Sequence, residues 1–254
     1  RVLFRSLELD KLAPDMTPLF ETIVDKVRKA AERARPLRVR GGGTKDFYGQ
    51  TLHGGLLGVD RVVWDVVSAS DDKLVLHYLH PDGQDGFPGN LDIEMTYSLT
   101  PDNEFRIDYK ATTDKPTVVN MSNHPFFNLK GEGNGTVLDN VMTINASHTT
   151  PVDSVLIPTG QIAPVEGTPF DFREPHAIGE RIGADNQQLR NGGGYDHNWV
   201  IDRKTESGIE QAATVWEPAS GRTIEVLSDQ PGLQVYSGRS EERRVGKECL
   251  RLCR

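Results

Sequence analysis

The chain has 254 residues, of which 36% are apolar and 26% are charged. This is enough for one large domain or two small ones with a filled core. The 25 glycines and 15 prolines indicate many chain reversals and favour a β-rich architecture over a helical bundle. No apolar run approaches the ~18 residues of a membrane span, and no secretory signal follows the basic N-terminus. We therefore expect a cytoplasmic protein with no membrane partner.

Charge is distributed unevenly along the chain. The formal net charge is −8, yet residues 41–238 hold 13 basic and 28 acidic residues, and both ends are basic. An acidic body repels phosphate backbones, so we expect no nucleic-acid partner. The two cysteines, Cys249 and Cys253, lie in the last six residues. This position excludes a disulfide scaffold and a thiol nucleophile from the rest of the chain.

Residues 17–33 are predicted to form one amphipathic helix. Thr17 can cap it and Pro18 suits its first position. Apolar residues recur at positions 19, 23, 27 and 31, and cations gather near the C-terminal end, as the helix dipole favours. Residues 37–50 then read as a short strand that runs into three glycines.

From about residue 51 the apolar pattern changes to a period of two. Residues 91–110 predict an antiparallel hairpin around the turn 101–103, and residues 213–226 predict another around 217–222. Further strands are expected at 62–67, 74–78 and 118–119. Residues 51–238 show no helix longer than about two turns and no internal repeat. The fold class is therefore predicted to be all-β, a large antiparallel sandwich.

Three clusters combine glycines, polar side chains and aromatic rings. They are LHGG with His53, SNHPFFNLKG with Asn123 and His124, and GGGYDHNWV with Asp196 and His197. Taken singly, each has a plain structural interpretation: a hydrogen-bonding loop histidine, a turn aspartate, or Phe126 and Phe127 in the core. Together they favour a small-molecule pocket. Imidazoles, amides and carboxylates with few cations suit a polyhydroxylated sugar better than a phosphate.

A metal site is the weaker interpretation of the same residues. No short-range ligand pair organises His53, His124, Asp196 and His197. His77 and His80 are three residues apart in a predicted strand, so their rings point to opposite faces. The chain also lacks a serine nucleophile elbow and a phosphate-binding P-loop.

Residues 51–238 resemble the aldose 1-epimerase (galactose mutarotase) family. The matching stretches follow the family's order: TLHGGLLGVDRVVW, DGQDGFPGNL, TDKPTVVNMSNHPFFNLKG, VDSVLIPTGQIAPVEGTPFDFR, GGYDHNWV and QPGLQVYSG. The resemblance implies a mutarotase-like β-sandwich that interconverts the α and β anomers of a free aldose without a cofactor. The reaction needs one group to protonate the ring oxygen and another to take the C1 hydroxyl proton.

The resemblance also assigns roles to individual residues. His124 would be the general acid, and His53 would hydrogen-bond the sugar near the reacting centre. Asp196 would accept from ring hydroxyls, with Asn123 and Gln234 also binding the substrate. The sugar preference and the oligomeric state do not follow from the sequence.

The chain departs from the family pattern after Gly238. The family's general base is a glutamate in a later strand, whereas residues 239–254 read RSEERRVGKECLRLCR, in which we expect no strand. We expect none of Glu241, Glu242 and Glu248 to serve as the base, because catalytic placement needs tolerances near ~0.5 Å. The chain as written is therefore predicted to be inactive or impaired. This tail and the opening RVLFRS resemble translated sequencing adapters, so we hypothesise that residues 1–6 and 239–254 are not native.

Residues 8–50 also differ from the family, whose sugar-binding Asn-Arg pair they lack. LRVRGGGTKDFYG resembles instead the start of an FAD-linked glycolate oxidase subunit, a fragment too short to hold FAD. We therefore expect a foreign segment at 1–50, the sandwich at 51–238 and a non-native tail at 239–254. Other possible functions are a non-catalytic sugar-binding module, a hexose-6-phosphate 1-epimerase and an FAD oxidase.

Overall fold

The computed structural model describes residues 2–6, 58–59, 62–131, 133–238 and 250–253. The predicted helix at 17–33, the strand before the three glycines and His53 lie outside the described residues. The chain divides into two compact units: one holds residues 1–12, 102–104 and 122–254, and the other holds 13–101 and 105–121. In the part of the chain that the structure describes, no helix is long and apolar enough to cross a membrane.

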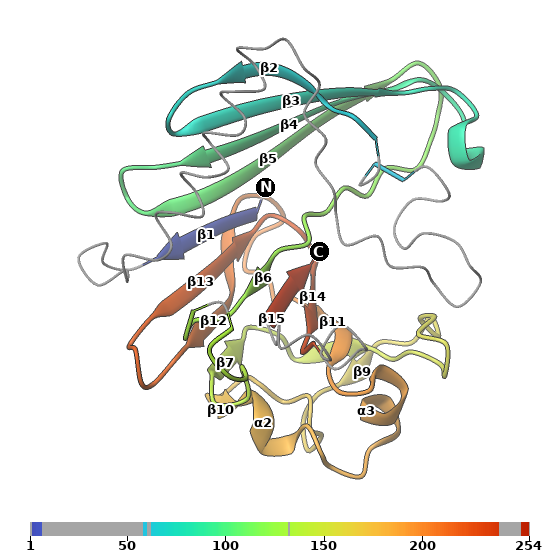
Figure 1. The fold of residues 1–254 in the computed structure, drawn as a ribbon. Helices are drawn as coiled ribbons and strands as arrows, with labels where there is room; N and C mark the ends of the chain where they lie inside the picture. The colour runs from blue at the N-terminus through green and yellow to red at the C-terminus, as the bar shows by residue number, and fades with distance from the viewer. Residues whose placement is uncertain (1, 7–57, 60–61, 132, 239–249, 254) are drawn as a thin grey trace. The chain divides into compact units, whose positions relative to one another are not determined.

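The second of these units contains an antiparallel meander (Figure 1). Its strands follow chain order: β2 (Asp65–Ala69), β3 (Lys73–His80), β4 (Leu91–Leu99) and β5 (Glu104–Thr113), with the short 3-10 helix η2 (Gln84–Gly86) after β3. The predicted hairpin at 91–110 is confirmed, because Met95 lies opposite Tyr109. Its inward residues Ile93 and Ile107 are completely buried with Leu76 of β3.

The strand predicted at 118–119 is wrong. No strand is assigned there, and Val118 and Val119 are 75% and 44% exposed. Pro116 shortly before them has no N–H to donate to a neighbouring strand. Two adjacent β-branched residues without a paired neighbour do not make a strand. The strand predicted at 62–67 is present but begins at Asp65.

The other unit holds two antiparallel sheets. The first has the order β10-β7-β12-β13-β1, made of β1 (Val2–Ser6), β7 (Val141–Ile144), β10 (His176–Ala177), β12 (Glu210–Trp216) and β13 (Thr223–Ser228). The predicted second hairpin is confirmed by the pairing of Val215 with Ile224 and of Ala213 with Val226. β1 pairs with β13 along its whole length.

The second sheet of this unit carries the residues of interest. Its order is β6-β15-β14-β11-β8-β9, made of β6 (Phe126–Phe127), β8 (His148–Thr150), β9 (Ala163–Pro164), β11 (Asp196–Val200), β14 (Gly232–Tyr236) and β15 (Leu250–Cys253). The expectation of no strand after Gly238 is wrong, because β15 pairs with β14 and β6. Strand pairing is made by backbone groups, so it does not need an alternating side-chain pattern. The adapter-like origin of 1–6 and 239–254 stays a prediction.

An aromatic core lies behind β11. Trp199 and Tyr195 are fully buried and pack against Phe170 and Phe172 of the loop between β9 and β10, with ring centroids 5.2–6.1 Å apart. The indole Nε1 of Trp199 donates to the Phe170 carbonyl at 3.0 Å. The buried indole N–H therefore has a hydrogen-bond acceptor.

Two short helices precede β11, namely α2 (Ile178–Arg181) and α3 (Gln187–Gly192). Gly193 caps the C-terminal end of α3, and its φ of 58° is left-handed and favours glycine. The side chain of Gln188 is hydrogen-bonded to both backbone groups of Val152, at 2.8 and 2.9 Å. α3 therefore fixes the point at which the chain enters β11.

Replacing Asn186 by alanine should lower the free energy of unfolding by about 1 kcal/mol. The Asn186 side chain caps α3 by accepting the Gln188 N–H at 2.8 Å, and alanine has no acceptor. Urea unfolding followed by circular dichroism measures the loss. Asn186→Ser keeps a capping oxygen and should retain most of the stability; an equal loss in both variants would contradict the capping argument.

Candidate functional site

β11 and β14 bring two of the predicted site residues into direct contact. In the antiparallel register Asp196 lies opposite Tyr236, and Asn198 lies opposite Gln234. These four side chains therefore share one face of the sheet. Across the diagonal, Gln234 Nε2 donates to Asp196 Oδ1 at 2.8 Å.

The Asp196 carboxyl is a partly desolvated acceptor. Burial raises its pKa above the ordinary aspartate value, and the hydrogen bond from Gln234 partly opposes that shift. Among the described residues, the structure records no cation and no second side chain that contacts this carboxyl. It is thus held by one neutral amide and can accept a further hydrogen bond from a ligand hydroxyl.

His124 is linked to β14 by a chain of ring contacts through Phe126. Its imidazole stacks on Phe126, with centroids 5.8 Å apart and planes at 10°. Phe126 in turn meets Tyr236 edge to face at 6.4 Å, and Tyr236 is the residue opposite Asp196. Asn123 precedes His124 and is half-buried. Three predicted residues, His124, Asp196 and Gln234, are thereby gathered around β14.

Phe126 does not behave as a core residue. Its side chain is 41% exposed, so the plain interpretation of this aromatic pair as core is wrong for Phe126. An exposed ring that stacks on an imidazole offers an apolar face beside polar groups. Such a combination is typical of small-molecule sites.

His197 differs from its neighbour Asp196. It is 1% exposed, and its ring lies 4.7 Å from that of Phe170. Burial lowers the pKa of His197 to about 4. Successive side chains of a strand point to opposite faces, so this ring is inside the core and not beside the Asp196 carboxyl. The alternation of His197 with Trp199 in DHNWV is the signal by which the sequence could have indicated this burial.

The unused histidines of β3 have structural partners. His77 Nε2 lies 3.1 Å from an Asp92 carboxyl oxygen, whereas His80 is buried and lies 3.9 Å from Asp85. The two rings occupy opposite faces, as predicted, and do not form a ligand pair.

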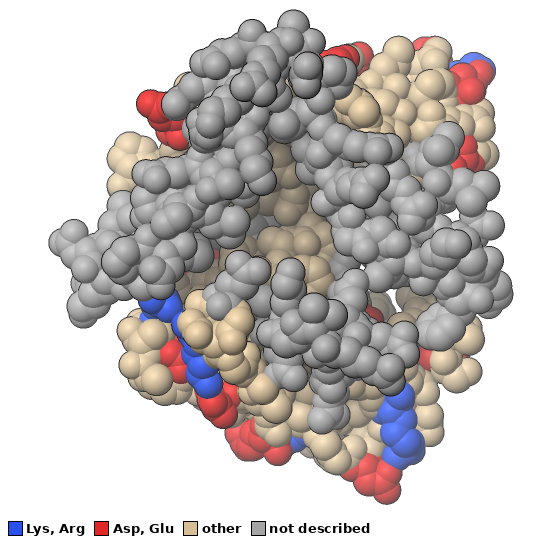
Figure 2. Space-filling model, viewed as in Figure 1, with Lys and Arg blue, Asp and Glu red and all other residues tan. Residues whose placement is uncertain are grey.

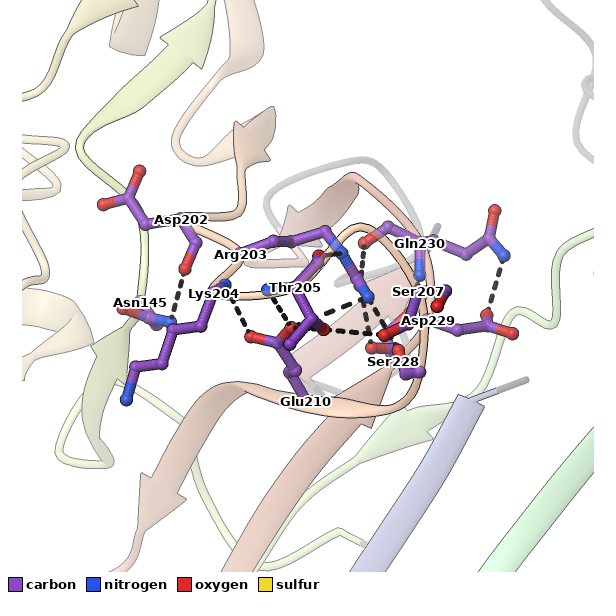
Figure 3. A network of polar contacts seen from close by, with 11 residues as sticks. Asn145, Asp202, Arg203, Lys204, Thr205, Ser207, Glu210, Ser228, Asp229 and Gln230 are labelled. Atoms are coloured by element: carbon purple, nitrogen blue, oxygen red, sulfur yellow. Dashed lines mark hydrogen bonds and ion pairs between the residues drawn. The ribbon is translucent and has the colours of Figure 1, made fainter.

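A cavity of about 700 Å³ lies elsewhere, at the ends of β7 and β12, where Arg173, Asp202, Lys204 and Glu210 line it. It contains none of the predicted site residues. Figure 3 shows the polar network beside it, in which Arg203 donates to several carbonyls of the loops around β12 and β14.

The charged groups of this cavity are largely used within the protein. The Glu210 carboxylate accepts from the backbone N–H groups of Lys204 and Thr205, which with the Thr205 hydroxyl lowers its pKa to about 2. Arg173 is held bidentately by Asp171, at 2.9 and 2.8 Å. We interpret the cluster as a clamp on the loop between β11 and β12.

Comparison with known proteins supports the fold and identifies the family. The family model described as Aldose 1-epimerase matches residues 37–251, beyond the predicted 51–238 at both ends. The galactose mutarotase of Sus scrofa is 40% identical over 188 residues, covering 74% of this chain and 52% of its own length. The aldose 1-epimerase of Escherichia coli strain K12 is 41% identical over 187 residues, covering 74% and 53%. The chain spans about half the length of these curated relatives.

Solved structures give the same result. The GalM/aldose epimerase homologue from C. elegans superposes with a TM-score of 0.69 at 26% identity, covering 86% of this chain and 71% of that one. The galactose 1-epimerase from Lactobacillus acidophilus NCFM gives a TM-score of 0.67 at 26% identity, covering 85% and 68%. The predicted all-β sandwich is confirmed, and the chain belongs to the aldose 1-epimerase family.

Proposed function

We propose that this chain binds a free aldose of the galactose or glucose type where β11 meets β14. We further propose that the whole protein interconverts the α and β anomers of that sugar. The observation that carries the proposal is the 2.8 Å contact between Gln234 and Asp196, with His124 joined to the same strand by the rings of Phe126 and Tyr236. Membership of the family supports the reaction class.

In the proposed reaction a base removes the C1 hydroxyl proton while His124 protonates the ring oxygen. The C1–ring oxygen bond breaks and gives the open-chain aldehyde. Rotation about the C1–C2 bond and reclosure, with both proton transfers reversed, give the other anomer. Asp196 would accept hydrogen bonds from ring hydroxyls, and Gln234 would keep its carboxyl oriented. The exposed face of Phe126 would contact the sugar's C–H groups.

We propose that this chain as written lacks the general base. The family resemblance places a glutamate after Gln234, and Glu241, Glu242 and Glu248 all lie outside the described residues. We propose that none of them serves, so that sugar binding persists while conversion is weak. A non-catalytic sugar-binding module would show the same behaviour with no loss of function.

A hexose-6-phosphate substrate is less well supported. Figure 2 shows Lys and Arg interspersed with Asp and Glu over the described part of the molecular face that it draws, without a continuous basic patch. A phosphate group is normally held by several cations or backbone N–H groups. The FAD oxidase alternative has no support among the described residues. Purified protein without the yellow colour of bound flavin would exclude it.

Galactose should bind weakly to the protein in ligand-observed NMR, and Asp196→Ala should reduce the affinity about ten- to a hundredfold. The reason is that the substitution removes a charged acceptor, worth about 1.5–3 kcal/mol. The matched control is Asp185→Ala, which removes a carboxylate whose side chain is 95% exposed and should leave binding unchanged. Equal effects of the two variants would contradict the proposed site.

Polarimetry of fresh α-galactose separates an impaired enzyme from a working one. We expect the protein to equilibrate the anomers no faster than its His124→Ala variant. A clear acceleration that depends on His124 would show that a base is present and would refute the loss proposed here. Binding without turnover is the expected combination.

A further inference from the structure

The backbone N–H of Asp196 lies where one edge of β11 has no strand partner among the residues that the structure describes. β14 pairs with the whole of β11, from Asp196 to Val200, whereas β8 pairs only with residues 198–200. The Ser237 N–H donates to the Tyr195 carbonyl at 2.8 Å, so Tyr195 faces β14. Because successive N–H groups alternate in direction, the Asp196 N–H points to the other side, beyond the end of β8.

His197 supplies the acceptor that β8 does not. The Asp196 N–H donates to His197 Nδ1 at 3.1 Å. Two neighbours hold the ring in place: Phe170 packs against it, and a Cβ on Gly192 would lie 3.0 Å from Cε1 of the ring. Gly192 thus leaves just enough room for the imidazole between α3 and the aromatic core.

The contact requires a neutral ring with its proton on Nε2. Nδ1 can accept only through its lone pair. Burial disfavours the charged imidazolium, which keeps that lone pair available at neutral pH. Nε2 is buried and has no hydrogen-bond partner among the described residues. A core residue chosen for packing alone would carry no such unsatisfied group, whose burial is costly.

We infer that His197 is a positioning residue for the sugar site. It acts on the opposite face of β11 and holds the Asp196 backbone, so that the carboxyl stays in reach of Gln234 and of a sugar hydroxyl. The effect on sugar binding rests on the proposed function, whereas the hydrogen bond between Asp196 and His197 does not. Two variants of the full chain test it. His197→Leu removes the acceptor with little change of volume, whereas His197→Asn places an amide oxygen close to the position of Nδ1.

The geometry is tested without any sugar. In His197→Leu the Asp196 amide should exchange its hydrogen at least about tenfold faster than in the wild type, while the Trp199 amide stays unchanged. His197→Asn should restore the protection. Should the leucine variant fail to fold, nitrogen NMR of the wild-type ring decides: an unprotonated Nδ1 supports the inference, and a proton on Nδ1 overturns it.

The consequence is tested by galactose titration of the same proteins. Affinity should fall about five- to tenfold in His197→Leu, the effect of one hydrogen bond, and recover in His197→Asn. If the wild type binds no galactose while the amide result is as expected, the proposed function fails and the positioning geometry stands. If amide exchange and affinity are both unchanged in a folded leucine variant, the inference itself is overturned.

Discussion

Replacing Trp199 by alanine should lower the free energy of unfolding by about 3–5 kcal/mol, enough to unfold a marginal domain. Trp199 is completely buried and packs against Phe170, Phe172 and Tyr195. The substitution leaves a cavity beside β11 and also removes the hydrogen bond that Nε1 donates to the Phe170 carbonyl. Urea unfolding followed by far-ultraviolet circular dichroism measures the change.

Trp216 provides a control of the same chemistry. It lies at the end of β12 and is 44% exposed. Trp216→Ala removes the same number of atoms but leaves no enclosed cavity, so we expect a loss of about 1 kcal/mol or less. Equal losses at the two positions would contradict the aromatic core as the main source of stability around β11.

Acidification from pH 6.5 to pH 4 should remove about 3 kcal/mol of stability through His197 alone. The folded-state pKa of about 4 lies below the free value of 6.5, so the unfolded chain takes up the proton first. The contribution is fully present above pH 6.5 and is lost as the pH falls towards 4. The Asp196 carboxyl acts in the opposite direction, because its pKa is raised in the folded state.

A comparison of the wild type with His197→Asn isolates the contribution of His197 to the pH dependence of the unfolding free energy. Other titrating groups are common to both chains, so their effects largely cancel in the difference of unfolding free energies. That difference should shrink by about 3 kcal/mol between pH 7 and pH 4. Parallel curves over this range would show that His197 is not buried in its neutral form.

The two large hairpins could be predicted because their evidence is local. Alternating apolar residues at 91–99 and 105–109 specify which face is buried, and the turn residues specify where the chain reverses. The same criterion failed at Val118 and Val119, since two residues are too few to show a period. It also missed β15, whose pairing with β14 is a matter of backbone geometry.

The sequence named the residues of the candidate site but could not give their geometry. Glycine-rich, aromatic and polar clusters indicated His124 and Asp196, and family resemblance added Gln234. Their contact depends on the register of two strands whose contacting residues are 38 positions apart. Likewise, the role of His197 arises from β8 ending before it reaches Asp196. Neither relation is visible in a linear string of residues.

The hydrogen bond between Asp196 and Gln234 restricts where residues can be inserted into or deleted from such a protein. A one-residue shift of β14 against β11 would turn Gln234 to the opposite face and separate the pair. The segment between the strands includes the exposed residues 204–208, where an added or lost codon leaves that alignment intact. Natural variants should therefore exclude insertions and deletions from 232–236.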